Sequence, residues 1–201
     1  MEIQFFKKKE DNQSIGVTKW IRTLFNEQYI TTIPSYLAMS GQELHKAIEQ
    51  YFKYKLVVNN SVEFKQFLIF AEDHVHLEPY MIEELICTDY LKWRGIVDMV
   101  YVDENEQFWL YDWKRSRGYM YDVSTFPTDS ISCLEFSLLN SYILQLNIYR
   151  IILESEYDMN IKGMKLVCFH PSLESYKVIT IPRLSSNVES EIVALRLSEI
   201  N

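Results

Sequence analysis

Three carboxylates and one ammonium group are spaced so that a short β-meander would bring them together: Glu83, Asp98, Asp112 and Lys114. Like charges that face each other on adjacent strands repel, and one lysine offsets only part of that repulsion. A hard divalent cation offsets it better, because Mg²⁺ and Mn²⁺ favour carboxylate and water ligands. Such a cation polarises a phosphoryl oxygen and acidifies a bound water, and a nearby lysine stabilises the developing charge. The four residues therefore indicate phosphodiester hydrolysis. The alternative is a row of solvated strand ends with a surface ion pair.

The meander is predicted from three segments that are rich in β-branched and aromatic residues and separated by turn-like stretches: 80–88, 91–102 and 108–115. If the second hairpin pairs symmetrically about Asn105, Asp98 faces Asp112 directly. The Cβ atoms of directly opposed residues lie about 4.5–5.5 Å apart. Lys114 follows Asp112 by two positions and therefore shares its face of the strand.

The first hairpin of the meander brings in the third carboxylate. If the chain turns between Tyr90 and Leu91, Glu83 faces Asp98. Glu84 then points to the other face, because a shift of one residue reverses the side of a strand. The surrounding sequence is strongly apolar, so we expect both faces of the sheet to be covered.

The other predicted elements surround this meander. Apolar residues at helical spacing predict helices over 18–25, from Ser40 onward, and over 61–73, 134–156 and 187–200. Ser40 and Glu43 form a capping box at the start of the second helix. The long fourth helix turns one row of residues inward: Leu138, Tyr142, Leu146, Tyr149 and Ile152. Two further strands are predicted over 163–169 and 175–181. This order predicts an α/β fold with a central mixed sheet flanked by helices.

Three short motifs follow one another along the chain: Gly95-Ile-Val-Asp98, Asp112-Trp-Lys114 and Gln145-Leu-Asn-Ile-Tyr149. They resemble the G-x-x-D, D-x-K and Q-x-x-x-Y motifs of the PD-(D/E)XK nuclease superfamily, in the order found in its RecB-type exonuclease branch. The helix around His45 resembles the early helix of that branch, which carries a metal-binding histidine. Glu83 matches the acidic residue on the strand before G-x-x-D.

The resemblance implies a restriction-endonuclease-like αβββαβ core and metal-dependent cleavage of DNA that leaves 5′-phosphate ends. On this analogy Mg²⁺ or Mn²⁺ is the cofactor, and its ligands are His45, Asp98, Asp112 and the carbonyl of Trp113. Lys114 is the catalytic lysine. A histidine ligand suits Mn²⁺, whereas Mg²⁺ prefers oxygen. A structural role is the alternative for His45.

Gln145 and Tyr149 lie four residues apart and therefore share one helix face. Without the motif they would be a core glutamine and tyrosine with satisfied hydrogen bonds; with it, they position the catalytic lysine or the substrate strand. Arg115 and Arg117 belong to a local basic cluster that could contact phosphates, and an ordinary solvated strand end is the alternative. Two nearby tyrosines, Tyr119 and Tyr121, could stack on unpaired bases or pack in the core.

Composition excludes several other classes of protein. The 201 residues carry a net charge of −8, so no global basic field indicates nucleic-acid binding. The five glycines are too far apart for a Walker loop or a dinucleotide fingerprint. Three scattered cysteines fit a reducing compartment and predict no iron–sulfur cluster, which takes four cysteine ligands. His74 and His76 lack further ligands at zinc spacing.

We therefore expect one nuclease domain over residues 1–201, intracellular and soluble, with no membrane segment and no secretory signal. The predicted activity is metal-dependent hydrolysis of DNA, as an exonuclease acting on ends or single strands. An RNA endonuclease is the first alternative. The second is a non-catalytic module that binds nucleic acid or protein on the same fold. The chain shows no evident DNA-reading domain, so a protein partner is one candidate for selecting the substrate.

Overall fold

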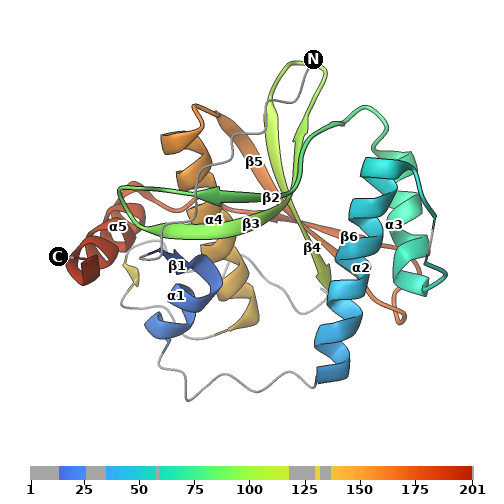
Figure 1. Cartoon of the computed structure of the whole chain (residues 1–201), viewed down its shortest axis with the longest axis horizontal. Helices are drawn as coiled ribbons and strands as arrows, with labels where there is room; N and C mark the ends of the chain where they lie inside the picture. Colours follow the sequence, from blue (N-terminus) through green and yellow to red (C-terminus); the bar gives the residue numbers. More distant parts are fainter. Residues whose placement is uncertain (1–13, 26–34, 58, 118–129, 132–136, 201) are drawn as a thin grey trace.

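The computed structural model describes residues 14–25, 35–57, 59–117, 130–131 and 137–200. These residues form a six-stranded mixed β-sheet with helices on both faces (Figure 1). The strands are β1 (Ile15–Gly16), β2 (Glu78–Cys87), β3 (Trp93–Val102), β4 (Phe108–Arg115), β5 (Ile161–Phe169) and β6 (Lys177–Ile181). The helices are α1 (Val17–Leu24), α2 (Ser35–Tyr54), α3 (Val62–Asp73), α4 (Leu138–Glu156) and α5 (Ser186–Ile200). The predicted α/β class with a central mixed sheet is confirmed.

Strand β3 has partners along both edges. β2 pairs with it antiparallel along one edge. On the other edge, β1 pairs at Trp93 and Arg94, and β4 pairs from Met99 to Val102. Between these two contacts, residues 95–98 have no strand partner on that edge within the described part of the chain. β4 continues parallel to β5, and β6 pairs antiparallel with β5.

Helices cover the two faces of the sheet with separate apolar cores. On one face α1, α4 and α5 contribute buried residues such as Trp20, Leu146 and Ile192. On the other face α2 and α3 pack side by side, and Phe67 meets Trp113 edge-on with 6.2 Å between the ring centroids. Figure 1 shows the two groups of helices on opposite sides of the sheet. Charged groups in the middle of β3 and β4 are therefore withdrawn from water.

Most of the predicted elements are confirmed. The segments 80–88, 91–102 and 108–115 correspond to β2, β3 and β4, and the helix over 61–73 corresponds to α3. Ser61 caps α3, because its hydroxyl oxygen accepts a hydrogen bond from the backbone N–H of Phe64 at 3.1 Å. β1 was not predicted, since two residues show no periodic pattern. No helix in the described ranges is both long and apolar enough to cross a membrane.

The predicted start of α2 is wrong. The helix begins at Ser35, so Ser40 and Glu43 lie inside it and form no N-terminal capping box. Residues 35–39 contain neither glycine nor proline, and nothing in them stops the helix from extending upstream.

The start of α4 also differs from the prediction. Ser137 is its N-cap, and the Ser137 hydroxyl oxygen accepts a hydrogen bond from the Asn140 N–H at 3.0 Å. Residues 134–136 lie outside the described residues. Leu138, predicted to point inward, is 49% exposed, because the buried face of α4 begins one residue later with Leu139 and Ile143.

Candidate active site

The register of the meander brings Glu83, Asp98 and Asp112 onto neighbouring strands. Ile82 pairs with Met99 and Glu84 with Val97, so Glu83 stands opposite Asp98 as predicted. In the second hairpin the pairing runs from Val102 and Phe108 to Met99 and Tyr111, which is the predicted symmetric register. Asp98 and Asp112 are the next residues, where β3 and β4 stop pairing with each other. The two aspartates therefore lie at the point where the strands part.

Asp98 occupies this point of separation. Its Oδ2 accepts a hydrogen bond from the backbone N–H of Trp113 at 2.8 Å. The carboxylate thus satisfies a β4 donor beside the unpaired edge of β3, and only 7% of the residue is exposed. Burial opposes ionisation of Asp98, but the charges of His45 and Lys114 outweigh it and lower its pKa.

His45 reaches the same point from α2. Its Nε2 lies 2.9 Å from the carbonyl oxygen of Trp113. A carbonyl oxygen only accepts hydrogen bonds, so Nε2 carries a proton and Nδ1 faces the carboxylates. Nδ1 lies 3.4 Å from Glu83 Oε1 and 3.4 Å from Asp98 Oδ1. The hydrogen bond between His45 on α2 and the Trp113 carbonyl on β4 therefore leaves Nδ1 as the ring nitrogen that can bind a ligand.

Glu83 completes this group from β2. Its backbone has a φ of 49°, a left-handed conformation that is uncommon for a non-glycine residue and interrupts the regular strand. Oε1 is buried and makes no hydrogen bond among the described residues. Burial raises the pKa of Glu83, and the contact with His45 opposes that rise. Glu83 therefore combines an uncommon backbone conformation with an incompletely satisfied buried carboxylate.

His45, Glu83 and Asp98 could hold a metal ion. Each offers one ligand atom, and these atoms all lie within 4.8 Å of one another. Burial lowers the pKa of His45, but Asp98 and Glu83 raise it to a net value of about 10. This pKa favours the protonated form of the His45 ring, whose Nδ1 lies near both carboxylates. Among the described residues this is the one such group of His, Cys, Asp and Glu side chains.

Asp112 and Lys114 form an ion pair next to the metal-binding group. Lys114 Nζ lies 2.5 Å from Asp112 Oδ2. Asp112 is 2% exposed, and its Oδ1 has no hydrogen-bond partner in the described part of the chain. Burial and the nearby Asp98 charge raise the pKa of Asp112 to about 6, against the opposing effect of Lys114. The Asp112 and Asp98 charges raise the pKa of Lys114 although burial lowers it. One oxygen of Asp112 is thus left for a ligand.

The predicted metal ligands fall into two groups. His45 and Asp98 lie together, and Glu83, which the resemblance does not name as a ligand, joins them. Asp112 instead pairs with Lys114. The Trp113 carbonyl oxygen accepts the His45 hydrogen bond and has a second lone pair. Its role as a metal ligand stays a prediction.

Gln145 and Tyr149 lie on α4 and contact each other. Gln145 Nε2 donates a hydrogen bond to the Tyr149 hydroxyl at 3.0 Å. The Tyr149 ring packs on Gly95 of β3, where an added Cβ would stand 2.4 Å from Tyr149 Cε1. The G-x-x-D and Q-x-x-x-Y motifs therefore meet in space. Burial raises the pKa of Tyr149 to about 12, and the Asp112 and Asp98 charges add to the rise.

The predicted phosphate contacts lie at the end of β4. Arg115 Nε pairs with Glu63 Oε1 of α3 at 2.6 Å, so part of its charge is already neutralised. Arg117 is exposed. His170, after β5, has a lowered pKa because of burial and the positive charges of Arg115 and Arg117. Tyr119 and Tyr121 lie outside the described residues.

Other histidines and cysteines have structural surroundings. His74 stacks on Phe70 with 4.1 Å between the ring centroids, and its Nδ1 lies 2.8 Å from the Phe70 carbonyl oxygen. The His76 ring lies 5.9 Å from that of His74. Cys87 and Cys168 are buried and form no disulfide among the described residues, and Cys133 lies outside the described residues.

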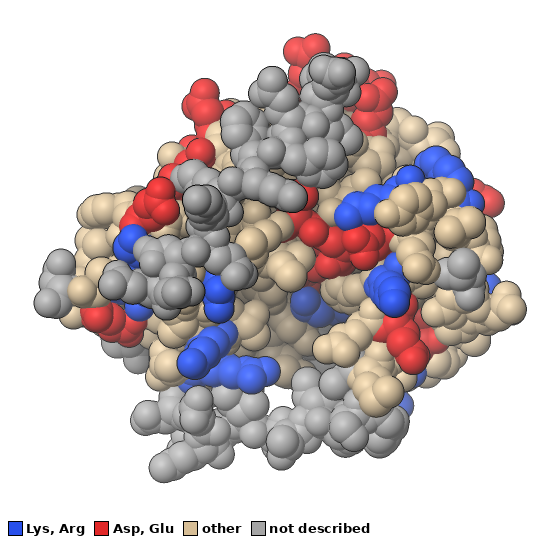
Figure 2. Space-filling model, viewed as in Figure 1, with Lys and Arg blue, Asp and Glu red and all other residues tan. Residues whose placement is uncertain are grey.

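A pocket of about 500 Å³ opens beside the metal-binding group. It is lined by Gly41, Gln42, His45, Lys46, Glu49 and Glu83. Figure 2 shows acidic side chains gathered around a hollow in the middle of this face, with basic side chains nearby. Solvent and ligands therefore have access to the site from the α2 side.

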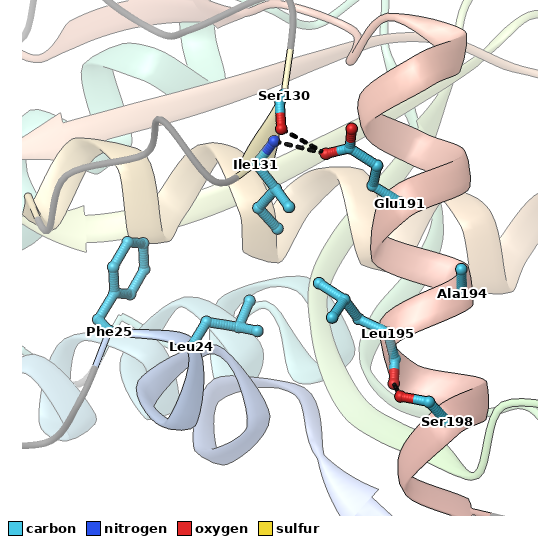
Figure 3. A pocket seen from close by; sticks show the side chains of 8 residues that line it. All are labelled: Leu24, Phe25, Ser130, Ile131, Glu191, Ala194, Leu195 and Ser198. Carbon is cyan, nitrogen blue, oxygen red and sulfur yellow. Dashed lines mark hydrogen bonds between the residues drawn. The ribbon is translucent and has the colours of Figure 1, made fainter.

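A larger pocket of about 640 Å³ lies elsewhere, between α1, α5 and residues 130–131 (Figure 3). Its walls are mostly apolar, and Glu191 accepts hydrogen bonds there from Ser130 Oγ at 2.9 Å and Ile131 N at 2.7 Å. None of its lining residues belongs to the metal-binding group.

No family model matches the chain, and no curated protein does either. Solved structures with a similar course include SSO0001, with 14% identity, a TM-score of 0.46, and coverage of 97% of this chain and 80% of that one. Another is an alkaline exonuclease (LHK-Exo) from Laribacter hongkongensis, with 13% identity, a TM-score of 0.48, and coverage of 94% of this chain and 88% of that one. Similarities at this level define no activity for the present chain.

Proposed function

We propose that this protein is a divalent-metal-dependent nuclease of the PD-(D/E)XK type, in the RecB-type exonuclease branch. It hydrolyses phosphodiester bonds of DNA, at ends or on single strands. The observation that carries the proposal is the juxtaposition of two groups where β3 and β4 part. One is the metal-binding group of His45, Glu83 and Asp98, and the other is the buried Asp112–Lys114 pair.

The donor set fits Mg²⁺ or Mn²⁺. Nδ1 of His45 and the carboxylates of Glu83 and Asp98 would hold the ion. We assign Asp112 as a further ligand through Oδ1, which has no hydrogen-bond partner among the described residues. Carboxylates suit both metals, and the imidazole favours Mn²⁺. When bound, the ion supplies a Lewis acid and lowers the pKa of a coordinated water. A cation also offsets the repulsion among the three carboxylates. Without metal, only the charges of one imidazolium and one ammonium group compensate this repulsion among the described residues.

We assign Lys114 the role of the catalytic lysine. Its ammonium is buried beside Asp112 and keeps its charge at any physiological pH, because its pKa is raised. It can stabilise the negative charge that develops on a phosphoryl oxygen, or orient the attacking water. Gln145 and Tyr149 contact each other on α4, and in the proposed enzyme their role is to position the lysine or the substrate strand.

The phosphate backbone would leave the site toward the end of β4. Arg115 and Arg117 lie one and three residues beyond Lys114, so we place neighbouring phosphates there. A net charge of −8 limits non-specific attraction to DNA, and a protein partner that selects the substrate is consistent with it.

The test is digestion of labelled DNA by wild-type protein and Asp112→Asn, with Mg²⁺, with Mn²⁺ and with a chelator. We expect linear single strands or duplex ends to be shortened only with metal, circular single strands to be spared, and the variant to lose at least about 100-fold in rate. Intact DNA with both metals would overturn the proposal. Preferential cleavage of a matched RNA would identify the RNA endonuclease instead. Calorimetry with Mn²⁺ on wild-type and Asp98→Ala protein separates an enzyme from a metal-free scaffold.

A further inference from the structure

Lys114 makes a second contact that none of the three motifs contains. Its Nζ lies 5.0 Å from the centroid of the Tyr142 ring on α4. An ammonium group over an aromatic face is attracted by the negative face of the ring. The ring therefore binds the same charge as Asp112, from the α4 side of the sheet.

The position of Tyr142 follows from the geometry of α4. Tyr142 lies three residues before Gln145 and seven before Tyr149, so the three side chains share one face of the helix. The Ser137 cap fixes the beginning of α4, one turn ahead of Tyr142. Tyr142 packs against the main core while remaining half-buried. The ring therefore lies over Lys114 while packing against the core.

The two contacts of Lys114 respond differently to a metal ion. Asp112 has one oxygen on Lys114, and its other oxygen has no hydrogen-bond partner among the described residues, so a cation held at Oδ1 would share the carboxylate charge. The attraction of Asp112 for the ammonium would then weaken. The Tyr142 ring carries no formal charge and is no ligand for a hard cation, so its attraction for the ammonium is unchanged.

We propose that Tyr142 is a positioning residue that holds the Lys114 ammonium in place when Asp112 engages the metal. The part of this inference that concerns the metal-bound protein rests on the proposed function. The contact itself exists in the metal-free protein. Tyr142 acts on the reaction through Lys114, and its aromatic ring rather than its hydroxyl supplies the contact.

A double-mutant cycle tests the contact without any enzymatic assay. Tyr142→Leu, Lys114→Met and the double variant are unfolded with urea, first without metal and then with saturating Mn²⁺. Without metal, we expect Tyr142→Leu to raise the unfolding equilibrium constant about fivefold more when Lys114 is present than when it is methionine. With Mn²⁺ the difference should grow. Tyr80→Leu is the matched control, because Tyr80 packs on Phe108 and should show no coupling to Lys114.

Kinetics then separate positioning from general packing. Tyr142→Leu should lower kcat about tenfold with KM changed less than twofold, and Tyr142→Phe should keep at least half of the wild-type kcat. Equal effects of Tyr142→Leu in the two Lys114 backgrounds, or a Phe variant as impaired as the Leu variant, would overturn the inference. If Mn²⁺ fails to stabilise the wild-type protein, the metal site and the proposed function fail, and the metal-free cycle still decides the role of Tyr142.

Discussion

The ring of Tyr149 on α4 lies directly on Gly95 of β3, three residues before Asp98. A Cβ atom at position 95 would stand 2.4 Å from Tyr149 Cε1 and 2.8 Å from its hydroxyl oxygen. Through this contact α4 packs on residues 95–98 of β3, which have no strand partner on one edge among the described residues. The glycine of the G-x-x-D motif is therefore required by the tyrosine of the Q-x-x-x-Y motif, and the two motifs form one structural unit.

Gly95→Ala should destabilise the protein by about 1–3 kcal/mol, because the new methyl group overlaps the Tyr149 ring. Urea unfolding measures the loss. In a Tyr149→Ala background the ring is gone, and the same substitution should cost much less. Gly41→Ala in α2 is the control: its Cβ meets nothing within 4 Å, and helix propensity predicts a gain of up to about 1 kcal/mol. Equal costs of Gly95→Ala in both backgrounds would contradict the contact.

Glu83 and Glu84 should differ sharply in metal binding. Glu83→Gln removes the charge of one carboxylate in the metal-binding group, so we expect the Mn²⁺ affinity to fall at least about tenfold. Glu84→Gln changes the same charge one residue along β2, outside the metal-binding group, and should leave the affinity within about twofold. Calorimetry on both variants checks this pair. A similar loss in both would mean that long-range charge, and not ligation, governs the affinity.

Metal binding should strengthen with rising pH. His45 has a pKa of about 10 without metal, so the ion must displace a proton from it throughout the neutral range. The Mn²⁺ association constant should rise about tenfold per pH unit between pH 6.5 and 8.5, and more steeply below the Asp112 pKa of about 6. Calorimetry in two buffers of different ionisation enthalpy counts the protons. His45→Ala should bind more weakly and lose the dependence above pH 6.5.

The metal-free protein should show the opposite trend in stability. The pKa of His45 is raised from 6.5 to about 10 by folding, so its stabilising effect is complete below pH 6.5 and declines as the pH rises toward 10. Thermal unfolding between pH 6 and 9 should therefore give a falling Tm in chelator, and this fall should be absent in His45→Ala. A flat profile in the wild-type protein would show that His45 is not charged in the folded state.

Lys114→Ala should separate turnover from binding. The ammonium acts on charge that develops during the reaction, so turnover should fall at least about 100-fold. DNA affinity, measured with Asp112 intact and without metal, should change less than threefold. Equal losses in turnover and in binding would show that Lys114 is a phosphate-binding residue and not a catalytic one.

Glu63 should restrain Arg115 from binding DNA. Because Arg115 Nε is paired with Glu63 at 2.6 Å, Glu63→Gln should raise metal-free DNA affinity about two- to fivefold. Arg117→Ala should lower affinity and reduce the salt slope by about one. Glu104→Gln, at the exposed turn at the other end of β4, changes the net charge equally and is the control. The same gain in both glutamine variants would indicate a general charge effect.

The sequence alone determined the meander and its register. Antiparallel strands joined by short turns have few possible pairings, and alternation of apolar residues selects one of them. Asp98, Asp112 and Glu83 could therefore be placed on neighbouring strands before any coordinates. The sequence predicted helix boundaries less accurately than strand register. Ser40 is an example, because a capping pattern inside a helix looks the same as one at its start.

Only the tertiary structure decided how these carboxylates divide. The gap in β3 pairing lies between the contacts with β4 and with β1, which has no sequence signal. Asp98 at the end of this gap accepts a hydrogen bond from the Trp113 N–H. Side-chain contacts across elements then assigned Glu83 to His45, Asp112 to Lys114, and Arg115 to Glu63. Local periodicity reports the face on which a residue lies. Periodicity does not report which charged group of a distant helix contacts that residue. This contact depends on how the helices pack on the sheet, which only the tertiary structure determines.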